Sequence, residues 1–405
     1  MNTVSIFLLG SGPNLVSEDE AEQDAKTDEI LKRFGIDLGS KFIIREEAEL
    51  NKLTINNVDV LIVFPCCMDR FTPLIRVADS KLPMLIVGEE NSFPDALDTY
   101  AYLSDHPNVE IAFTAEEAKN KLKTLEAAKW VKAAKVCVFG LEDLKPEQLA
   151  WYKNPMGLGK LNTQPVNKEK AIEAFRNTDM TEAESLAKKW FEECEVKEPS
   201  FEDIVLSARV YLALKSILEE TNADAAYVPW CGQFTSGFGT KMCFAIAKVA
   251  DEGVPIGCWR GENLLPMLVL HAISKKPVFV CEANLRQGKI ISLRHCFAPA
   301  TIANCKYTLR RWRNMEHTVT GYCQLPKGTV TLVNCGIGDK ILITKGQVLD
   351  CKDLEGDNCR ITICVELENE ETIRKFVGRE FAMVYGDYEE DAKETSRRLG
   401  LQVLL

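Results

Sequence analysis

The sequence contains no apolar run that approaches the ~18–20 residues a helix needs to cross a bilayer. It also contains no internal repeat, no low-complexity tract and no two cysteines at C-x-x-C spacing. The first apolar segment, 4–10, is short and has no basic flank, which favours a β-strand over a signal peptide. These absences exclude a membrane-spanning helix and make a structural zinc site unexpected.

An excess of positive charge is missing as well. The chain has 49 Lys and Arg against 60 Asp and Glu, a net charge of −11. Such a balance disfavours nucleic acid or an anionic membrane surface as the main partner. Hydrophobic residues make up 46% and charged residues 27%, which is typical of a well-packed globular protein. With 405 residues the chain exceeds the size of a single core, so two or three domains are expected.

Cysteine, in contrast, is abundant, with 15 residues. Most cysteines lie inside apolar strand-like runs, as Cys137 and Cys364 do. In such positions they behave as small buried hydrophobic residues that stay reduced. Cys66 and Cys67 are adjacent, a spacing that rarely lets two thiols ligate one metal. The pattern predicts a soluble cytoplasmic protein and not a disulfide scaffold.

The chain divides by pattern into three regions. Residues 1–128 alternate continuous apolar runs with helical segments, as in a parallel sheet covered on both faces. Residues 129–297 continue this alternation, and Ser200 with Asp203 forms a capping-box pattern before a long helix. Residues 298–405 change to short strands separated by Gly, Asp and Asn turns. The predicted fold class is α/β, with two doubly wound Rossmann-like domains followed by a C-terminal antiparallel β-barrel.

Individual elements follow from the apolar runs. The segment 152–165, which carries Pro155, Gly157 and Gly159, is expected to be irregular. The expected strands are 4–9, 59–64, 84–87, 136–140, 225–230, 254–258, 277–281, 329–333, 340–343, 347–349, 360–366 and 381–385, and the expected helices include 18–34, 69–78, 114–135 and 389–399.

Polar residues follow several of the predicted strands in the middle region. Ligands of open α/β sheets bind outside the carboxyl ends of the strands, so these residues are expected to converge on one cleft. Two carboxylates, an imidazole and an arginine are among them. The candidate site residues are Gln233, Arg260, Glu262, Glu282, Asn284 and His295.

Each candidate has a plainer structural explanation. Glu262 can be an acid favoured at a helix N-terminus, and Arg260 can simply pair with it. A lone histidine such as His295 is more often a satisfied structural residue than a ligand. Cys231 and Cys296 lie beside the predicted cleft, but no neighbouring His–Asp pair marks either as a nucleophile.

Two further features carry weaker signals. The turn Gly10–Pro13 follows the first strand, yet it lacks the third glycine of a dinucleotide fingerprint and Pro13 removes an amide donor. The basic run 310–313 can bind phosphate or an acidic partner, or form a solvated or interface segment.

Residues 254–300 resemble the sugar-isomerase core shared by L-fucose and L-arabinose isomerases and their relatives. The Lys-Pro-Val-Phe sequence at 276–279 leads into Glu282, and His295 precedes a cysteine. Residues 327–350 resemble the C-terminal β-barrel of that family, and 378–404 resemble its closing segment. The first 200 residues agree only in their α/β style and in the sequence Phe-Pro-Cys-Cys after a strand.

The resemblance implies a divalent metal, usually Mn²⁺, that binds two adjacent oxygens of a free sugar. A carboxylate then moves a proton through an ene-diol, and the metal stabilises the charge on both oxygens. It implies Glu262 and Glu282 as catalytic residues, and a homo-oligomer such as a trimer or hexamer. The implied metal ligands are Glu262, Glu282, His295 and Glu380, and the implied sugar contacts are Gln233, Arg260, Asn284 and His295.

Three positions depart from the family pattern. Arg260 stands where the family has an acid, Glu380 replaces a histidine, and Phe297 stands where a glycine is usual. The first hypothesis is therefore an aldose–ketose isomerase acting on a free sugar, with Mn²⁺ or another divalent cation. The second is a diverged, metal-free sugar-binding protein on the same fold, in which an arginine supplies the positive charge. The third is a structural or interaction protein whose acidic surface keeps a large oligomer in solution.

Overall fold

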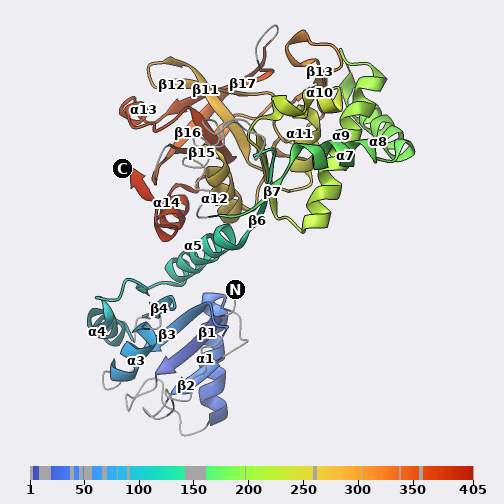
Figure 1. The fold of residues 1–405 in the computed structure, drawn as a ribbon. Helices are drawn as coiled ribbons and strands as arrows, with labels where there is room; N and C mark the ends of the chain where they lie inside the picture. Colours follow the sequence, from blue (N-terminus) through green and yellow to red (C-terminus); the bar gives the residue numbers. More distant parts are fainter. Residues whose placement is uncertain are drawn as a thin grey trace. The chain divides into compact units, whose positions relative to one another are not determined.

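The computed structural model shows two compact units, Met1–Glu126 and Ala127–Leu405 (Figure 1). Each unit is described by itself. The described residues are 3–8, 20–36, 41–44, 49, 57–65, 71–79, 81–88, 92–141, 161–196, 198–258, 262–303, 305–336, 339–354 and 359–404. The turn Gly10–Pro13, the adjacent Cys66 and Cys67, and Arg260 lie outside the described residues.

The first unit is built on a five-stranded parallel sheet with the order β2-β1-β3-β4-β5. Successive residues of its central strand enter two separate cores: Leu61 and Val63 pack with α3 and α4, whereas Ile62 and Phe64 pack with α1 and α5. A strand buried on both faces needs a continuous apolar run, which is why the sequence pattern was informative here. The elements are β1 (Thr3–Leu8), α1 (Glu20–Phe34), β2 (Lys41–Ile44), β3 (Val60–Pro65), α3 (Phe71–Asp79), β4 (Met84–Val87), α4 (Phe93–Leu103), β5 (Val109–Ala112) and α5 (Ala115–Ala133).

The second unit begins with a four-stranded parallel sheet of order β10-β9-β6-β7. Strand β7 overlaps the last four residues, 162–165, of the segment predicted to be irregular, so that part of the prediction is wrong; residues 152–160 lie outside the described residues. Only Val166 of this strand is buried, and Pro165 lacks an amide donor, so the edge strand carries almost no apolar signal. The elements are β6 (Lys135–Phe139), β7 (Asn162–Val166), α7 (Lys168–Arg176), α8 (Met180–Glu193), β8 (Glu195–Val196), α9 (Phe201–Thr221), β9 (Ala225–Val228), η2 (Cys231–Phe234), α10 (Thr235–Phe238), α11 (Cys243–Asp251), β10 (Ile256–Cys258) and α12 (Leu264–Ser274).

The capping box before α9 is confirmed. Ser200 Oγ accepts from the Asp203 amide at 3.2 Å, and the Asp203 carboxylate accepts from the Ser200 amide at 3.0 Å. Two amides that the first helical turn cannot satisfy internally thereby gain partners. The helix then buries residues on much of its circumference between the sheet and the neighbouring helices.

The rest of the second unit forms a closed six-stranded antiparallel β-barrel, β15-β18-β11-β12-β17-β16, which the pairing of β15 with β16 closes. Its elements and those around it are β11 (Phe279–Gln287), β12 (Ile290–His295), β13 (Thr308–Arg310), β14 (Thr320–Tyr322), β15 (Gly328–Cys335), β16 (Lys340–Asp353), β17 (Ile361–Leu367), α13 (Glu371–Arg374), β18 (Glu380–Tyr385), α14 (Glu389–Arg398) and β19 (Gln402–Leu404), with short 3-10 turns η3 (Ala300–Ile302) and η4 (Trp312–Asn314).

The expectation that 277–281 continues the parallel sheet is wrong. Strand β11 pairs antiparallel with both β12 and β18, and it therefore belongs to the barrel. Only Gly288 and Lys289 connect β11 to β12, and so short a connection permits a hairpin but no parallel crossover. The two runs predicted at 340–343 and 347–349 are likewise one strand, β16, with an irregularity between Val348 and Asp350.

Helix α12 joins the parallel sheet to the barrel. It starts just after β10 and packs against β15 and β18, so Asn263 and Glu262 at its N-terminal end face the barrel wall. One continuous core runs from the parallel sheet through α12 into the barrel. The carboxyl ends of β9 and β10 consequently meet the barrel strands.

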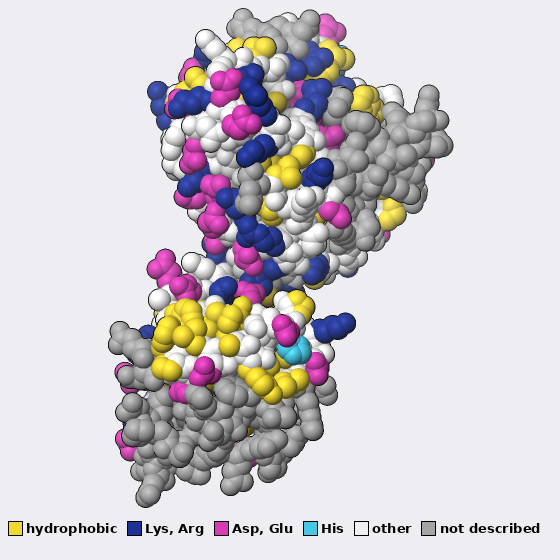
Figure 2. Space-filling model, turned by 90° about the vertical axis from the view of Figure 1, so that its left-hand side faces the viewer, with side chains coloured by type: hydrophobic (Ala, Val, Ile, Leu, Met, Phe, Trp, Pro, Cys, Tyr) yellow, Lys and Arg dark blue, Asp and Glu magenta, His cyan; other side chains and the backbone are white. Residues whose placement is uncertain are grey.

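Charges of both signs alternate on the face of the second unit drawn in Figure 2. Every described cysteine is a free thiol. None of the helices in the described ranges combines the length and the apolar character required to cross a membrane.

Candidate functional site

A cavity of about 230 Å³ lies where the ends of β9 and β10 meet the barrel strands β11 and β12. Ligand pockets of drug-sized molecules span about 300–1,000 Å³, so this cavity suits a small molecule. Two indole rings and five thiols form most of its wall, and four ionisable side chains supply its polarity. The lining residues are Trp230, Cys231, Gly232, Lys241, Cys243, Cys258, Glu282, His295, Cys296, Trp312, Arg313 and Cys359.

Glu282 enters the cavity wall from β11. In the barrel register it lies opposite Glu380 on β18 and Arg294 on β12, and directly opposite residues of antiparallel strands share a face. Arg294 Nε donates to Glu282 Oε1 at 3.0 Å, and Arg379 Nη2 donates to the other carboxylate oxygen, Oε2. The Glu282 side chain is therefore buried as a charge that two guanidinium groups compensate.

His295 ends β12 and is 5% exposed. Burial lowers the pKa of its imidazole to about 4, although the charge of Glu282 acts in the opposite direction. Its Nε2 lies 3.7 Å from Cys258 Sγ, and its ring meets the edge of Phe297 with centroids 4.6 Å apart. At neutral pH His295 is thus an uncharged imidazole beside a carboxylate.

A second buried polar group lies next to this cavity, between the sheet and the barrel. Tyr227 at β9 donates its hydroxyl to Asn263 Oδ1 at 2.6 Å, and Asn263 Nδ2 donates to Glu380 Oε2 at 3.1 Å. All three side chains are inaccessible to solvent. Glu262, which precedes Asn263, places its carboxylate against Gly378, where an added Cβ would lie 3.0 Å from Oε2. Neither Glu262 nor Glu380 lines the cavity.

The cysteines of the cavity differ in acidity. A hydrogen bond with Cys258 lowers the pKa of Cys231, and the positive charge of Lys241 adds to this effect. The pKa of Cys258 is raised by the same contact and by burial. Cys296 Sγ and Cys359 Sγ lie 3.5 Å apart, and a hydrogen bond with Cys243 raises the pKa of Cys296.

Trp312 is fixed on the cavity wall by a hydrogen bond and by two cations. Its indole Nε1 donates to Cys296 Sγ at 2.9 Å. Lys241 Nζ lies 4.6 Å from the ring centroid and Arg313 Cζ lies 4.8 Å from it, both within cation–π range.

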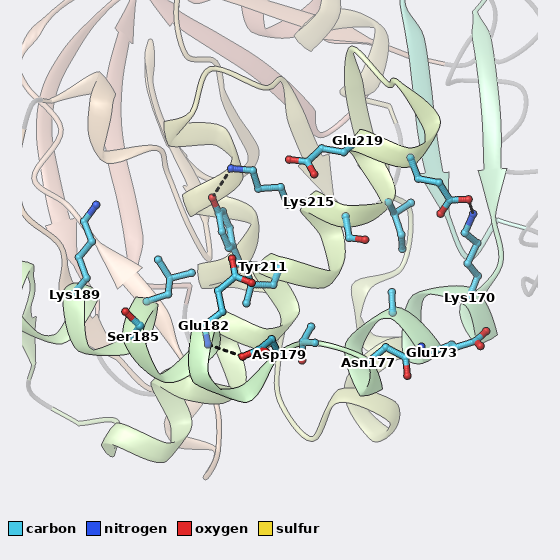
Figure 3. A pocket seen from close by; sticks show the side chains of 17 residues that line it. Lys170, Glu173, Asn177, Asp179, Glu182, Ser185, Lys189, Tyr211, Lys215 and Glu219 are labelled. Atoms are coloured by element: carbon cyan, nitrogen blue, oxygen red, sulfur yellow. Dashed lines mark hydrogen bonds and ion pairs between the residues drawn. The ribbon is translucent and has the colours of Figure 1, made fainter.

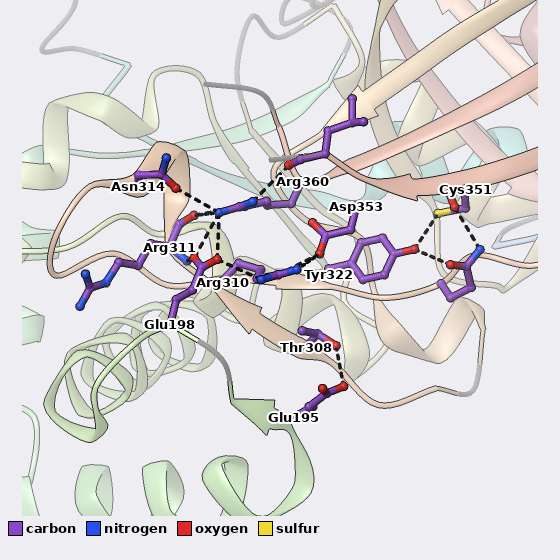
Figure 4. Close-up of polar contacts among 12 residues, drawn as sticks. Glu195, Glu198, Thr308, Arg310, Arg311, Asn314, Tyr322, Cys351, Asp353 and Arg360 are labelled. Carbon is purple, nitrogen blue, oxygen red and sulfur yellow. Dashed lines mark hydrogen bonds and ion pairs between the residues drawn. The ribbon is translucent and has the colours of Figure 1, made fainter. Parts of the chain in front are cut away.

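The segment that carries Trp312 is tied down by buried arginines (Figure 4). Arg360 is 2% exposed; its guanidinium donates to the Arg311 carbonyl and pairs with Glu198 at 3.1 Å. Arg310 pairs with Glu198 at 3.0 Å and with Asp353 at 2.5 Å. Arg310 and Arg311 of the basic run 310–313 therefore make structural contacts, and Arg313 reaches the cavity.

The predicted site residues divide into three groups. Glu282 and His295 line one cavity, whereas Glu262 and Glu380 lie in the neighbouring polar group. Gln233 instead donates to the Gly140 carbonyl at 3.2 Å, and Asn284 occupies the irregularity in the β11–β12 pairing. Lys241, Trp312 and Arg379 were not predicted as site residues.

The implied metal was tested against these donor groups. Both oxygens of Glu282 bind guanidinium groups, and Arg379 also places its Nε 3.9 Å from Glu380 Oε1. A positively charged side chain thus lies between two of the predicted carboxylate ligands. Within the described ranges, no cluster of three or more His, Cys, Asp and Glu side chains is arranged to hold a metal ion. The described carboxylates, as they are placed, do not fit a divalent cation.

A larger hollow of about 1040 Å³ lies among α7, α8 and α9 (Figure 3). Its side chains carry both charges; Lys170 pairs with Glu220 at 2.7 Å, and Asp179 accepts from the Glu182 amide at 2.9 Å to cap α8. None of the predicted site residues lines it. The hollow therefore offers no converging set of groups comparable with the smaller cavity.

Comparison with known proteins found no family model that matches this chain. No curated protein matches it either.

Proposed function

We propose that the cavity binds a small sugar and that Glu282 and His295 interconvert its aldose and ketose forms through an ene-diol. One observation carries the proposal: a carboxylate and an uncharged, buried imidazole face the same small cavity. The resemblance of residues 254–300 and 327–404 to sugar isomerases supports the same reaction class.

The reaction requires a base and a hydrogen-bond donor. A carbonyl moves between C1 and C2 when a base transfers a proton from one carbon to the other while the hydroxyl proton passes between the two oxygens. The Glu282 carboxylate is the proposed base. His295, because it is neutral, is the proposed donor to the oxygen on which negative charge develops, a division of roles known from other proton-transfer sites.

The positive charge that a metal would supply comes from arginine in this proposal. Arg294 and Arg379 each pair with Glu282, and their charges are the proposed stabilisers of the ene-diolate. The reaction therefore proceeds without a metal-dependent step, in place of the Mn²⁺ that the resemblance implies. Added Mn²⁺ is then expected to change neither turnover nor thermal stability.

Binding of a sugar without turnover is the second candidate. It is favoured by the two guanidinium contacts of Glu282, because both carboxylate oxygens are already engaged in charge-assisted hydrogen bonds within the protein. Both candidates place the sugar in the same cavity, but only the isomerase candidate predicts exchange of the C2 proton of the sugar with solvent.

The proposal also concerns the domain types and the oligomeric state of the protein. We propose that the two parallel sheets are two Rossmann-like domains and that the barrel is the third, C-terminal part. The order β2-β1-β3-β4-β5, with helices on both faces, supports this assignment for the first sheet. A homo-oligomer, trimer or hexamer, remains the prediction that the family resemblance implies.

Deuterium exchange provides the test. A panel of pentoses and hexoses is incubated with the protein in D₂O, and loss of the C2 proton signal is followed by NMR. The wild-type protein is expected to exchange and isomerise at least one sugar. Glu282→Gln keeps the shape of the side chain, so the protein should stay folded while exchange falls roughly 100-fold or more.

A surface carboxylate provides the matched control. Glu366 pairs with Lys289 at 3.2 Å on the barrel surface and does not line the cavity, so Glu366→Gln should exchange at the wild-type rate. Sugar-induced thermal stabilisation without exchange would favour the binding-only candidate. Exchange that persists in Glu282→Gln would remove Glu282 from the mechanism.

A further inference from the structure

Two cations of the cavity have no carboxylate partner. Lys241 and Arg313 both line the cavity, and neither makes an ion pair with any side chain in the described ranges. The carboxylate of Glu282 does not neutralise them, because Arg294 and Arg379 already occupy both of its oxygens. Among the residues that the structure describes, the cavity therefore carries an excess of positive charge.

The excess charge acts on the interior of the cavity as well as on its solvent-exposed side. Lys241 is half-buried, and its charge contributes to the lowered pKa of the Cys231 thiol. Arg313 is exposed. An anionic group that enters between them would meet one cation toward the interior and one toward solvent.

The backbone that presents Arg313 is held in an unfavourable conformation. Arg313, Asn314 and His317 all have positive φ, at 48°, 57° and 56°, a region that side chains larger than glycine rarely adopt. Such conformations persist only where the surroundings enforce them. Here Arg360 donates to the Arg311 carbonyl and to Asn314 Oδ1, and Asp203 lies 3.0 Å from His317 Nδ1.

The alternative explanation is that the two cations only pack on Trp312. Cation–π contacts explain why Lys241 and Arg313 lie near the ring, but they leave the charges uncompensated. They do not account for three residues with positive φ in a short segment, nor for the buried arginine that holds the segment in place.

We propose that Lys241 and Arg313 form an oxyanion-binding subsite, so that the ligand of the cavity is a small sugar carrying a carboxylate or phosphate group. The identification of the ligand as a sugar rests on the proposed function, whereas anion binding by these two residues does not. Two cations favour phosphate, which carries close to two negative charges at neutral pH, over a carboxylate.

Isothermal titration calorimetry on the full chain compares D-ribose, D-ribonate, D-ribose 5-phosphate and inorganic phosphate. The phosphate ester is expected to bind roughly tenfold or more tightly than ribose, in the range that charge-assisted hydrogen bonds provide. Ribonate should lie between them. The advantage of the anions should decrease as NaCl is raised, because salt screens partly exposed charges.

Variants then locate the subsite. Lys241→Met and Arg313→Met should each reduce the affinity for D-ribose 5-phosphate and inorganic phosphate about tenfold and reduce the affinity for ribose by a clearly smaller factor. Lys327→Met and Arg176→Met are matched controls, because both residues are exposed and neither lines the cavity. Both controls should bind every ligand as the wild type does.

The outcomes separate this proposal from the proposed function. Equal affinity for ribose and its phosphate ester, or phosphate binding that Lys241→Met and Arg313→Met both leave intact, would overturn the subsite. Binding of inorganic phosphate that depends on Lys241 and Arg313, without proton exchange in any sugar, would retain the subsite and reject the isomerase.

Discussion

The protonation state of His295 connects the chemistry of the cavity to the stability of the chain. A buried imidazole next to a carboxylate normally gains a proton, but here burial has the larger effect and the pKa falls to about 4. The proposed reaction needs the neutral form. A neutral imidazole donates a hydrogen bond to the developing oxyanion, and the Glu282 carboxylate alone moves the proton between the two carbons. The cost of this arrangement is a dependence of folding on pH.

Replacing His295 should flatten that dependence. Between pH 6.5 and about 4 the unfolded chain binds a proton that the folded chain does not, so acidification through this window destabilises the fold. The shift corresponds to a loss on the order of 3 kcal/mol in the free energy of unfolding below pH 4. In His295→Asn this component is absent. Urea unfolding at pH 7, 5.5 and 4.5 should therefore give a free energy of unfolding that changes less with pH than that of the wild type.

A substitution that removes no ionisable group serves as the control for this measurement. Leu285→Ala is expected to show the wild-type pH dependence, because Leu285 is 71% exposed and carries no titratable proton. Identical pH dependences for wild type and His295→Asn would mean that the folded and unfolded chains protonate His295 to the same extent.

At the scale of elements, the contact between β9, α12 and β18 joins the parallel sheet to the barrel. Tyr227, Asn263 and Glu380 contribute one side chain from β9, from the start of α12 and from β18. Buried polar groups are costly when they lose a partner, so this chain of hydrogen bonds fixes the register of helix and barrel. The proposed site depends on it, because β11, which carries Glu282, pairs with β18.

Asn263 is the central member of this chain and should be the most sensitive to change. Asn263→Ala removes the bonds to both neighbours and is expected to cost about 2–3 kcal/mol, whereas Tyr227→Phe removes one hydroxyl and should cost about 1 kcal/mol. In the double variant the effects should not add, because the tyrosine hydroxyl has then already lost Asn263. Chemical denaturation of all three variants measures these differences, and additive values would show that the two bonds are independent.

Individual elements show which parts of the fold could be predicted from the sequence. Continuous apolar runs identified β3, β4 and β9, and one cap pattern located the start of α9. Strand β7 escaped because an edge strand with one buried residue leaves almost no pattern. Strand β11 was identified as a strand but assigned to the wrong sheet, because an apolar run reports burial and not the direction of its partners.

The candidate site, like the fold, could be predicted only in part from the sequence. Glu282 and His295 come at the ends of apolar runs, where position in the chain indicates position in the sheet. Arg379 contacts Glu282 through the register of the barrel, whereas Trp312 lines the cavity from a loop of unusual backbone conformation. No short-range sequence pattern indicates either contact. The basic run 310–313 was noticed, but only the structure separates the exposed Arg313 from the half-buried Arg310 and Arg311.

At the scale of the whole molecule, α5 contributes to two separate cores. Ala118, Leu122 and Leu125 pack with the first unit, whereas Ala127 and Val131 belong to the core of the second. All residues that line the cavity lie between 230 and 359, within the second unit. The second unit should therefore fold and bind ligand without the first, provided that α5 is kept whole.

A fragment of residues 114–405 tests this independence. Leu122→Lys and Leu125→Lys are included, because both leucines would otherwise expose apolar surface once the first unit is removed. The fragment is expected to unfold cooperatively in calorimetry and to bind sugars and anions within twofold of the full chain. A fragment of 127–405 keeps only residues 127–133 of α5. This remnant is shorter than the about 12–15 residues at which isolated helices become marginally stable, so the melting temperature of the fragment should be lower. A 114–405 fragment without a cooperative transition would show that the second unit requires the first in order to fold.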